Sequence, residues 1–172
     1  MLVNEILPDF DFCERQEIDV SASSENVFSA IKQIDLCEST MIYWLLKMRG
    51  AKIKTLNLRD LEEGNFKTLS EIPNQTLILG AINEFGTQAK ALADLTKEDF
   101  RSFNKEKFVK TLWSFQLKEV NGKIRVTNET RIKCTDGDSL VKLKNYWGMI
   151  KPFVNKFGDE ALKLTKKRAE RL

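Results

Sequence analysis

Residues 110–133, KTLWSFQLKEVNGKIRVTNETRIK, form two alternating runs on either side of Asn121-Gly122. An Asn-Gly pair between two strand-like runs favours a two-residue type I′ turn and hence a β-hairpin. A two-residue loop fixes the register, so residues at equal distances from the turn should lie opposite each other. Trp113 then faces Thr130, and Phe115 faces Asn128.

The two faces of this hairpin differ in composition. The face with Trp113 and Phe115 carries most of the apolar side chains, so we expect it to be the inner face of a sheet. The other face carries Lys110, Glu129 and Arg131. We therefore expect Glu129 and Arg131 to point outward, as partners across strands at a solvent-exposed surface, and not to work as an enclosed acid/base pair.

A strand-to-helix junction and a long helix follow the hairpin. Thr135 or Asp136 is expected to cap the helix, with Asp138 favouring its dipole, because a calcium loop needs more oxygen ligands at regular spacing. Apolar residues then recur three and four apart and predict one helix of some thirty residues: Leu140, Leu143, Trp147, Ile150, Val154, Phe157, Ala161 and Leu164. Pro152 should kink this helix. The stripe could also be a coiled-coil seam, but the preceding sheet needs a cover.

The first half of the chain supplies the other elements. Residues 12–20 alternate and predict a half-buried strand, and residues 21–34 predict a short helix with serine caps. Residues 39–48, STMIYWLLKM, are apolar almost all round, which favours a second short helix pressed into the core. A membrane-contact interpretation is less favoured, because this stretch is too short to span a bilayer and lacks a basic polar face.

The middle of the chain changes to short runs bounded by turn residues. Residues 51–58, 65–72 and 75–82 predict consecutive antiparallel strands, with Pro73-Asn74 as a turn. Residues 83–106 are less regular, although Thr96 and Asp99 predict a capped short helix within them. A connection of this length could be a lid.

Composition excludes several functional classes. The chain has 172 residues, 42% of them hydrophobic, which suits one domain over residues 1–172. Its 28 basic and 25 acidic residues are mixed along the chain, which favours neither nucleic acid nor an acidic substrate. With no basic leader and no long apolar run, we expect a cytoplasmic protein without stable membrane insertion.

Histidine is absent, which excludes Ser-His and Cys-His nucleophiles and the ordinary zinc sites. The three cysteines, Cys13, Cys37 and Cys134, are too few and too widely spaced for a disulfide framework or a CxxC motif. We expect each to be a small buried side chain. Neither a metal nor a cofactor is expected.

Together these elements predict an α+β fold in which a curved antiparallel sheet of about seven strands wraps a long C-terminal helix, with two short helices after the first strand. This order resembles the helix-grip fold of the START-like (SRPBCC) superfamily, which includes the birch-pollen allergen relatives and the polyketide cyclase/dehydrase-like proteins. The nearest local likeness, to uncharacterised bacterial members, is ETRIKCTDGDSLVKLKNYWGMIKPF, residues 129–153. The resemblance implies a cavity between sheet and helix that holds an apolar or amphipathic small molecule.

Such a cavity would be lined by the inner hairpin face and the helix stripe. The candidate ligand-binding residues are Thr111, Trp113, Phe115, Asn128, Thr130, Trp147, Ile150, Val154 and Phe157. The favoured function is binding of a lipid or aromatic compound, without catalysis. The alternatives are a cyclase-, dehydrase- or hydrolase-like enzyme using Tyr43, Glu14 or Tyr146, and a protein-interaction module. These aromatic residues could also simply fill a closed core.

Overall fold

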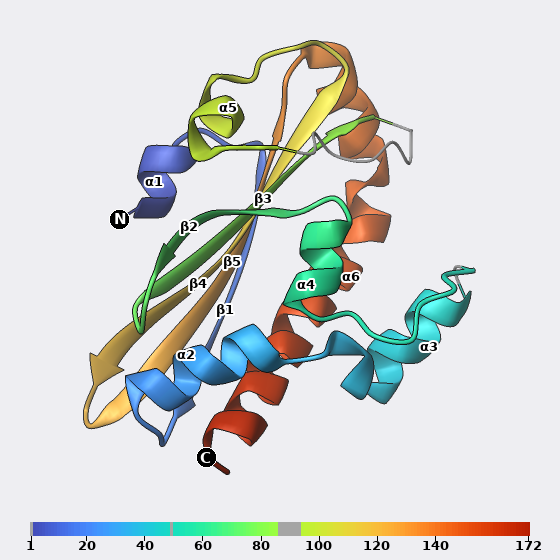
Figure 1. Ribbon diagram of the computed structural model, residues 1–172. Coiled ribbons are helices and arrows are strands. Elements are labelled where there is room, and N and C mark those ends of the chain that lie inside the picture. The colour runs from blue at the N-terminus through green and yellow to red at the C-terminus, as the bar shows by residue number, and fades with distance from the viewer. Residues whose placement is uncertain (1, 49, 86–93) are drawn as a thin grey trace.

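The computed structural model describes residues 2–48, 50–85 and 94–172 (Figure 1). Its elements in chain order are α1 (Leu2–Ile6), β1 (Phe12–Val20), α2 (Ser24–Gln33), a 3₁₀ turn η1 (Leu36–Glu38), α3 (Thr40–Met48), α4 (Leu58–Glu63), β2 (Lys67–Ile72), β3 (Thr76–Glu84), α5 (Lys97–Ser102), β4 (Phe108–Val120), β5 (Lys123–Cys134) and α6 (Gly137–Ala169). The strands form one antiparallel sheet in the order β1-β5-β4-β3-β2.

The predicted hairpin register is confirmed over its whole length. β4 and β5 pair from Val109 opposite Cys134 to Val120 opposite Lys123. Asn121 and Gly122 both have positive φ, 51° and 75°, as a type I′ turn requires. Trp113 and Phe115 consequently lie on the same face of the sheet and are both buried.

The predicted helix caps are also confirmed. Ser23 caps α2, and Thr96 and Asp99 form a capping box at α5. Asp136 caps α6 by accepting from the amide of Ser139 at 2.9 Å, and a further amide, that of Lys107, donates to the same carboxylate at 2.6 Å. These bonds to the charged form lower the pKa of Asp136 to about 2. α6 runs for 33 residues with Pro152 inside it.

The expected strand count of about seven is wrong, because the described residues contain five. Residues 51–57 are not a strand, and α4 follows them at Leu58. Asn57 and Asp60 form a capping box there, so their side chains accept hydrogen bonds from amides at the start of the helix. In a strand, those amides would have to pair with a neighbouring strand. The backbone of Leu56 is held by Asp35, whose carboxylate accepts from its amide at 2.7 Å. Hydrogen bonds of this kind from the backbone to side chains replace the pairing that a strand over these residues would need, despite their alternating pattern.

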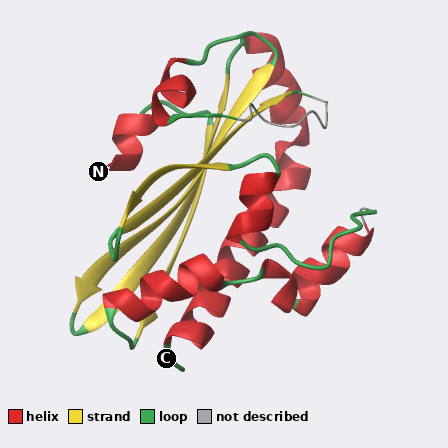
Figure 2. Ribbon diagram, viewed as in Figure 1, coloured by secondary structure: helices red, strands yellow, loops and turns green. Residues whose placement is uncertain are grey.

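Helices cover both faces of the sheet (Figures 1 and 2). α2 and α6 pack on the inner face, where the main apolar cluster lies. α1 and α5 cover the outer face, where a second apolar cluster includes Leu7, Ile78, Phe100 and Leu112. The protein therefore has three layers, with helices on the face of the sheet that the sequence predicted to be exposed to solvent.

The third layer overturns the solvent exposure expected for Glu129 and Arg131. Both side chains point away from α6, as predicted, but they are only 3% and 7% exposed, because the N-terminal segment lies over them. Arg131 Nε donates to Glu129 Oε1 at 2.5 Å, and the two remaining guanidinium nitrogens donate to the carbonyl of Leu7 and to Asn4 Oδ1, each at 2.7 Å. The pair is a buried attachment for the chain start.

Two other burial expectations are wrong in part. α3 forms where predicted, but Ile42 is its only buried residue, and Figure 1 shows the helix projecting from the body of the molecule. Of the three cysteines only Cys134 is buried, while Cys13 is exposed and Cys37 is partly buried. Of the connection predicted as a possible lid, residues 83–106, residues 86–93 lie outside the described residues.

Candidate functional site

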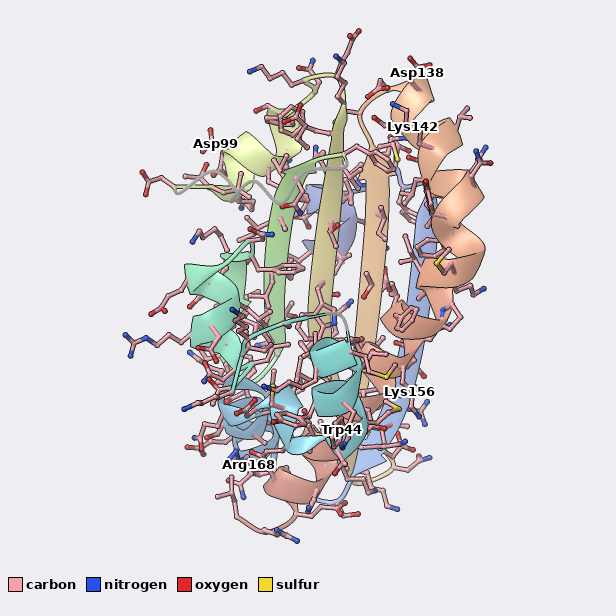
Figure 3. The ribbon with its side chains drawn as sticks, turned by 90° about the vertical axis from the view of Figure 1, so that its right-hand side faces the viewer. Trp44, Asp99, Asp138, Lys142, Lys156 and Arg168 are labelled. Atoms are coloured by element: carbon pink, nitrogen blue, oxygen red, sulfur yellow. The ribbon has the colours of Figure 1, made fainter. Side chains whose placement is uncertain are left out.

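A cavity of about 360 Å³ lies between the inner face of the sheet and α6. Its lining comes from four parts of the chain: Leu36 and Leu56 on either side of α3, Leu61 and Phe66 in and after α4, Thr111, Trp113, Thr130 and Ile132 on the hairpin, and Ile150, Phe153, Val154, Phe157 and Gly158 on α6. Figure 3 looks onto the sheet between α4 on the left and α6 on the right.

Local periodicity explains how the lining residues come together. Residues of β4 and β5 alternate between faces, so Thr111 and Trp113 point to the same side as their partners Ile132 and Thr130. On α6, Ile150, Val154 and Phe157 are four and three residues apart and form one stripe toward the sheet. The cavity is thus a direct consequence of the period-two and period-3.6 patterns of two adjoining segments.

The chemistry of the lining is simple. It contains no charged side chain among the described residues, and its only side-chain hydroxyls belong to Thr111 and Thr130. Within the described part of the chain, neither hydroxyl has a hydrogen-bond partner. A mostly apolar cavity with a few free polar groups is typical of small-molecule sites, which commonly measure roughly 300–1,000 Å³.

Six of the nine candidate residues line this cavity: Thr111, Trp113, Thr130, Ile150, Val154 and Phe157. Phe115 is instead packed in the core, beside a gap of only about 20 Å³. Trp147 stacks on Phe12 of β1, with ring centroids 4.3 Å apart. These two aromatic rings serve packing, which was the competing interpretation for each of them.

Asn128, the third residue outside the lining, lies where α6 touches the sheet. Its Nδ2 donates to the carbonyl of Ser114 at 3.3 Å, while its Oδ1 is buried without a partner. A Cβ at Gly158 would come within 2.7 Å of that oxygen and within 2.3 Å of Gln16 Oε1. The helix therefore approaches the two amides closely, and a Cβ at residue 158 would require these side chains to shift.

The lining also contains residues that the sequence interpretation missed. Ile132 and Phe153 were within reach, because Ile132 shares the face of Thr130 and Phe153 follows Ile150 by three positions. Leu36, Leu56, Leu61 and Phe66 gave no such signal. Leu56 lies in a stretch, residues 51–58, that was predicted as a strand, and Leu61 lies in α4, a helix that was not predicted.

The proposed catalytic groups of the enzyme alternative do not meet in the cavity. Glu14 lies 3.3 Å from Lys151, Tyr146 is 51% exposed, and Tyr43 lies under the ammonium of Lys47 at 5.4 Å. None of the three belongs to the lining. Across the described residues, no three Cys, Asp or Glu side chains are grouped so that they could share a metal ion.

Comparison with known proteins gives distant matches to solved structures. No protein-family model matches the chain, and no curated protein matches it either. Solved structures do match. These matches are all under 25% identical and have TM-scores below 0.5, so the START-like resemblance stays a prediction from the sequence.

Three neighbours illustrate the likeness. A protein of Mesorhizobium loti has a TM-score of 0.46 and 13% identity, covering 91% of this chain and 98% of its own. The Aha1 dimer from Colwellia psychrerythraea has a TM-score of 0.36 and 16% identity, and the match covers 86% of this chain and 96% of that one. The di-domain ARO/CYC StfQ from the steffimycin biosynthetic pathway has a TM-score of 0.40 and 8% identity, and the match covers 98% of this chain and 54% of that one. Since every score is below 0.5, no activity is transferred from them.

Proposed function

We propose that this protein binds an uncharged apolar or weakly amphipathic small molecule, such as a lipid or aromatic compound, in the cavity between the sheet and α6. The observation that carries the proposal is a 360 Å³ space whose lining has no charged side chain and is mostly apolar, with the hydroxyls of Thr111 and Thr130 and the indole N–H of Trp113 as its polar side-chain groups. An ionised group placed there would lose its hydration without gaining a counter-ion, which is very costly.

The shape of the lining supports the same ligand class. Trp113, Phe153 and Phe157 offer flat apolar surfaces from both the sheet and the helix. Thr111 and Thr130 lie on neighbouring strands, so a single hydroxyl or carbonyl group of a ligand could reach both. The absence of an ionisable side chain from the lining favours binding over catalysis of proton transfer.

Native mass spectrometry of freshly purified protein tests for a retained ligand, and Nile red fluorescence provides an uncharged probe for the emptied protein. Val154→Phe should fill the cavity and weaken Nile red binding by at least about tenfold, equivalent to 1.4 kcal/mol. Val141→Phe adds the same ring to the same helix at a position that is 60% exposed, and it should leave probe binding unchanged.

A second pair of variants examines the two hydroxyls. Thr111→Val and Thr130→Val keep the side-chain shape but remove the hydrogen-bonding group. A probe with one polar group should lose about two- to tenfold in affinity, the value of one hydrogen bond, whereas a pure hydrocarbon should not. Equal probe binding by the wild type and Val154→Phe, with no retained ligand, would overturn the proposal.

A further inference from the structure

Three large apolar side chains project into solvent from one face of α3. Met41, Trp44 and Met48 are 38%, 62% and 81% exposed, and their spacing of three and four places them on one side of the helix. α3 lies between Leu36 and Leu56 in the chain, and both of these residues line the cavity. The exposed apolar face is therefore attached to the cavity wall.

α6 contributes a second face on the same side of the molecule. Lys142, Tyr146, Met149, Phe153 and Lys156 recur at spacings of four and three and so form one stripe. Phe153 lines the cavity, while Tyr146 and Met149 are 51% and 64% exposed. Figure 1 places α3 and the first half of α6 on its right-hand side, and Figure 3 shows that side with Trp44, Lys142 and Lys156 labelled.

The two stretches of sequence that carry these side chains are basic, although the carboxylates of Asp138 and Glu160 border them. Residues 39–57 contain four basic residues and no acidic one, and residues 139–158 contain four lysines and no acidic residue. The whole chain has a net charge of only +3, so its remainder is net negative. Two of these lysines have carboxylate neighbours, Lys151 with Glu14 at 3.3 Å and Lys156 with Glu160 at 3.8 Å. Lys52, Lys54 and Lys142 have no ion-pair partner among the described residues.

We propose that this surface, the mouth face, docks on an anionic lipid membrane. The mouth face consists of Met41, Trp44 and Met48 with the basic loop 51–57, and of Lys142, Tyr146 and Met149 on α6. Apolar and aromatic side chains that enter the interface, surrounded by lysines that meet anionic headgroups, are the features of interfacial membrane binding. None of the described helices has the length and apolar character needed to cross a bilayer, so the contact is peripheral.

The same observations disfavour other occupants. A second copy placed symmetrically on the mouth face would oppose two sets of the same unneutralised lysines, and like charges repel. Nucleic acid would satisfy the lysines but would leave Met41, Trp44 and Met48 in water. Only a lipid surface offers both an anionic layer and an apolar interior. Docking concerns the mouth face alone and does not depend on the cavity being occupied.

Vesicle flotation tests the proposal. Vesicles of phosphatidylcholine with about one-third phosphatidylglycerol should bind the protein, with affinity falling at high salt, while pure phosphatidylcholine should bind it weakly. Lys52→Gln/Lys54→Gln/Lys142→Gln should weaken binding by roughly a hundredfold, at about fivefold per lysine. Met41→Ser/Trp44→Ser/Met48→Ser should also abolish flotation. Lys118→Gln/Lys123→Gln, at exposed positions near the β4–β5 turn, is the matched control and should bind as the wild type does.

Each result has a defined meaning. Equal binding by the lysine variant and the control, or no binding to anionic vesicles at low salt, overturns the proposal. A wild-type dimer that the Met41→Ser/Trp44→Ser/Met48→Ser variant converts to a monomer overturns it in favour of self-association. Nile red binding in the absence of vesicles tests the cavity separately, so a failure of membrane docking can be told from a failure of the proposed ligand binding. Circular dichroism confirms that each variant is folded.

Discussion

Replacing Arg131 with methionine should release the N-terminal segment from the outer face of the sheet. Arg131 is 7% exposed and joins three parts of the chain: Glu129 on its own strand, the carbonyl of Leu7, and Asn4 in α1. Its guanidinium also lies 4.7 Å from the ring centroid of Phe10. Methionine retains much of the apolar volume but removes the charge and all three hydrogen bonds.

The size of the effect follows from what is left behind. Glu129 is 3% exposed, and its one remaining ion-pair partner among the described residues would be Arg15, at 3.7 Å from its Oε2. Removing one partner of a buried ion pair typically costs about 3–5 kcal/mol, because the other charge stays buried without compensation. We expect Arg131→Met to lie in this range. Glu129→Met/Arg131→Met should be at least about 2 kcal/mol more stable than the single variant, because it leaves no unpaired charge.

Urea unfolding followed by circular dichroism measures these free energies, provided that the slope m stays constant. Hydrogen exchange of residues 2–11 then reports whether the chain start has come loose. Arg59→Met is the matched control, because Arg59 and Glu63 form a pair whose side chains are 85% and 63% exposed, and no measurable change is expected. A loss below about 1 kcal/mol for Arg131→Met would refute the assigned role of the pair.

Further predictions concern α6. Gly148→Ala should stabilise the protein by about 0.5–1 kcal/mol, because alanine favours helix and a Cβ there meets nothing within 4 Å. Gly158→Ala should instead lower the free energy of unfolding by about 1–3 kcal/mol, because its Cβ would collide with Gln16 and Asn128. Thermal unfolding compares the two variants, and equal shifts in Tm would contradict the close approach of α6 to these side chains. The pKa of Asp136 is about 2 in the folded protein against 3.8 ordinarily, so its charge contributes stability above pH 3.8 that is lost as the pH falls toward 2. Asp136→Asn should flatten the acid dependence in that window, and an unchanged acid titration of stability would disprove this contribution.

The sequence predicted the hairpin and α6 well because both depend on local rules. The Asn121-Gly122 turn requires positive φ at both positions, and that requirement sets every pair of residues along β4 and β5. The six correctly placed cavity residues all belong to these two segments. Their side-chain directions follow from periodicity alone.

The remaining errors arose where tertiary contacts decide. Nothing in the alternation of Glu129 and Arg131 shows that α1 will cover them, because the covering segment is more than a hundred residues away in the chain. The helix α3 has a core-like composition, yet its exposure depends on where η1 and the following loop place it. Asn57 and Asp60 form a capping box at the end of the stretch predicted as a strand, and this helix signal competes with the strand-like alternation of residues 51–58.

The distribution of charge over the two faces of the sheet connects the fold with the proposed function. The outer face holds Lys110, Glu129 and Arg131, all buried under α1 and α5, whereas the lining on the cavity side has no charged side chain. An ionised end of a bound amphipathic molecule would thus find no counter-ion within the lining, whereas Lys52 and Lys54 lie in the loop that leads to the lining residue Leu56. We therefore expect such a molecule to bind tail first, with its charged end at the side that would face a membrane. A charged group found beside Thr111 and Thr130 in a complex would contradict this orientation.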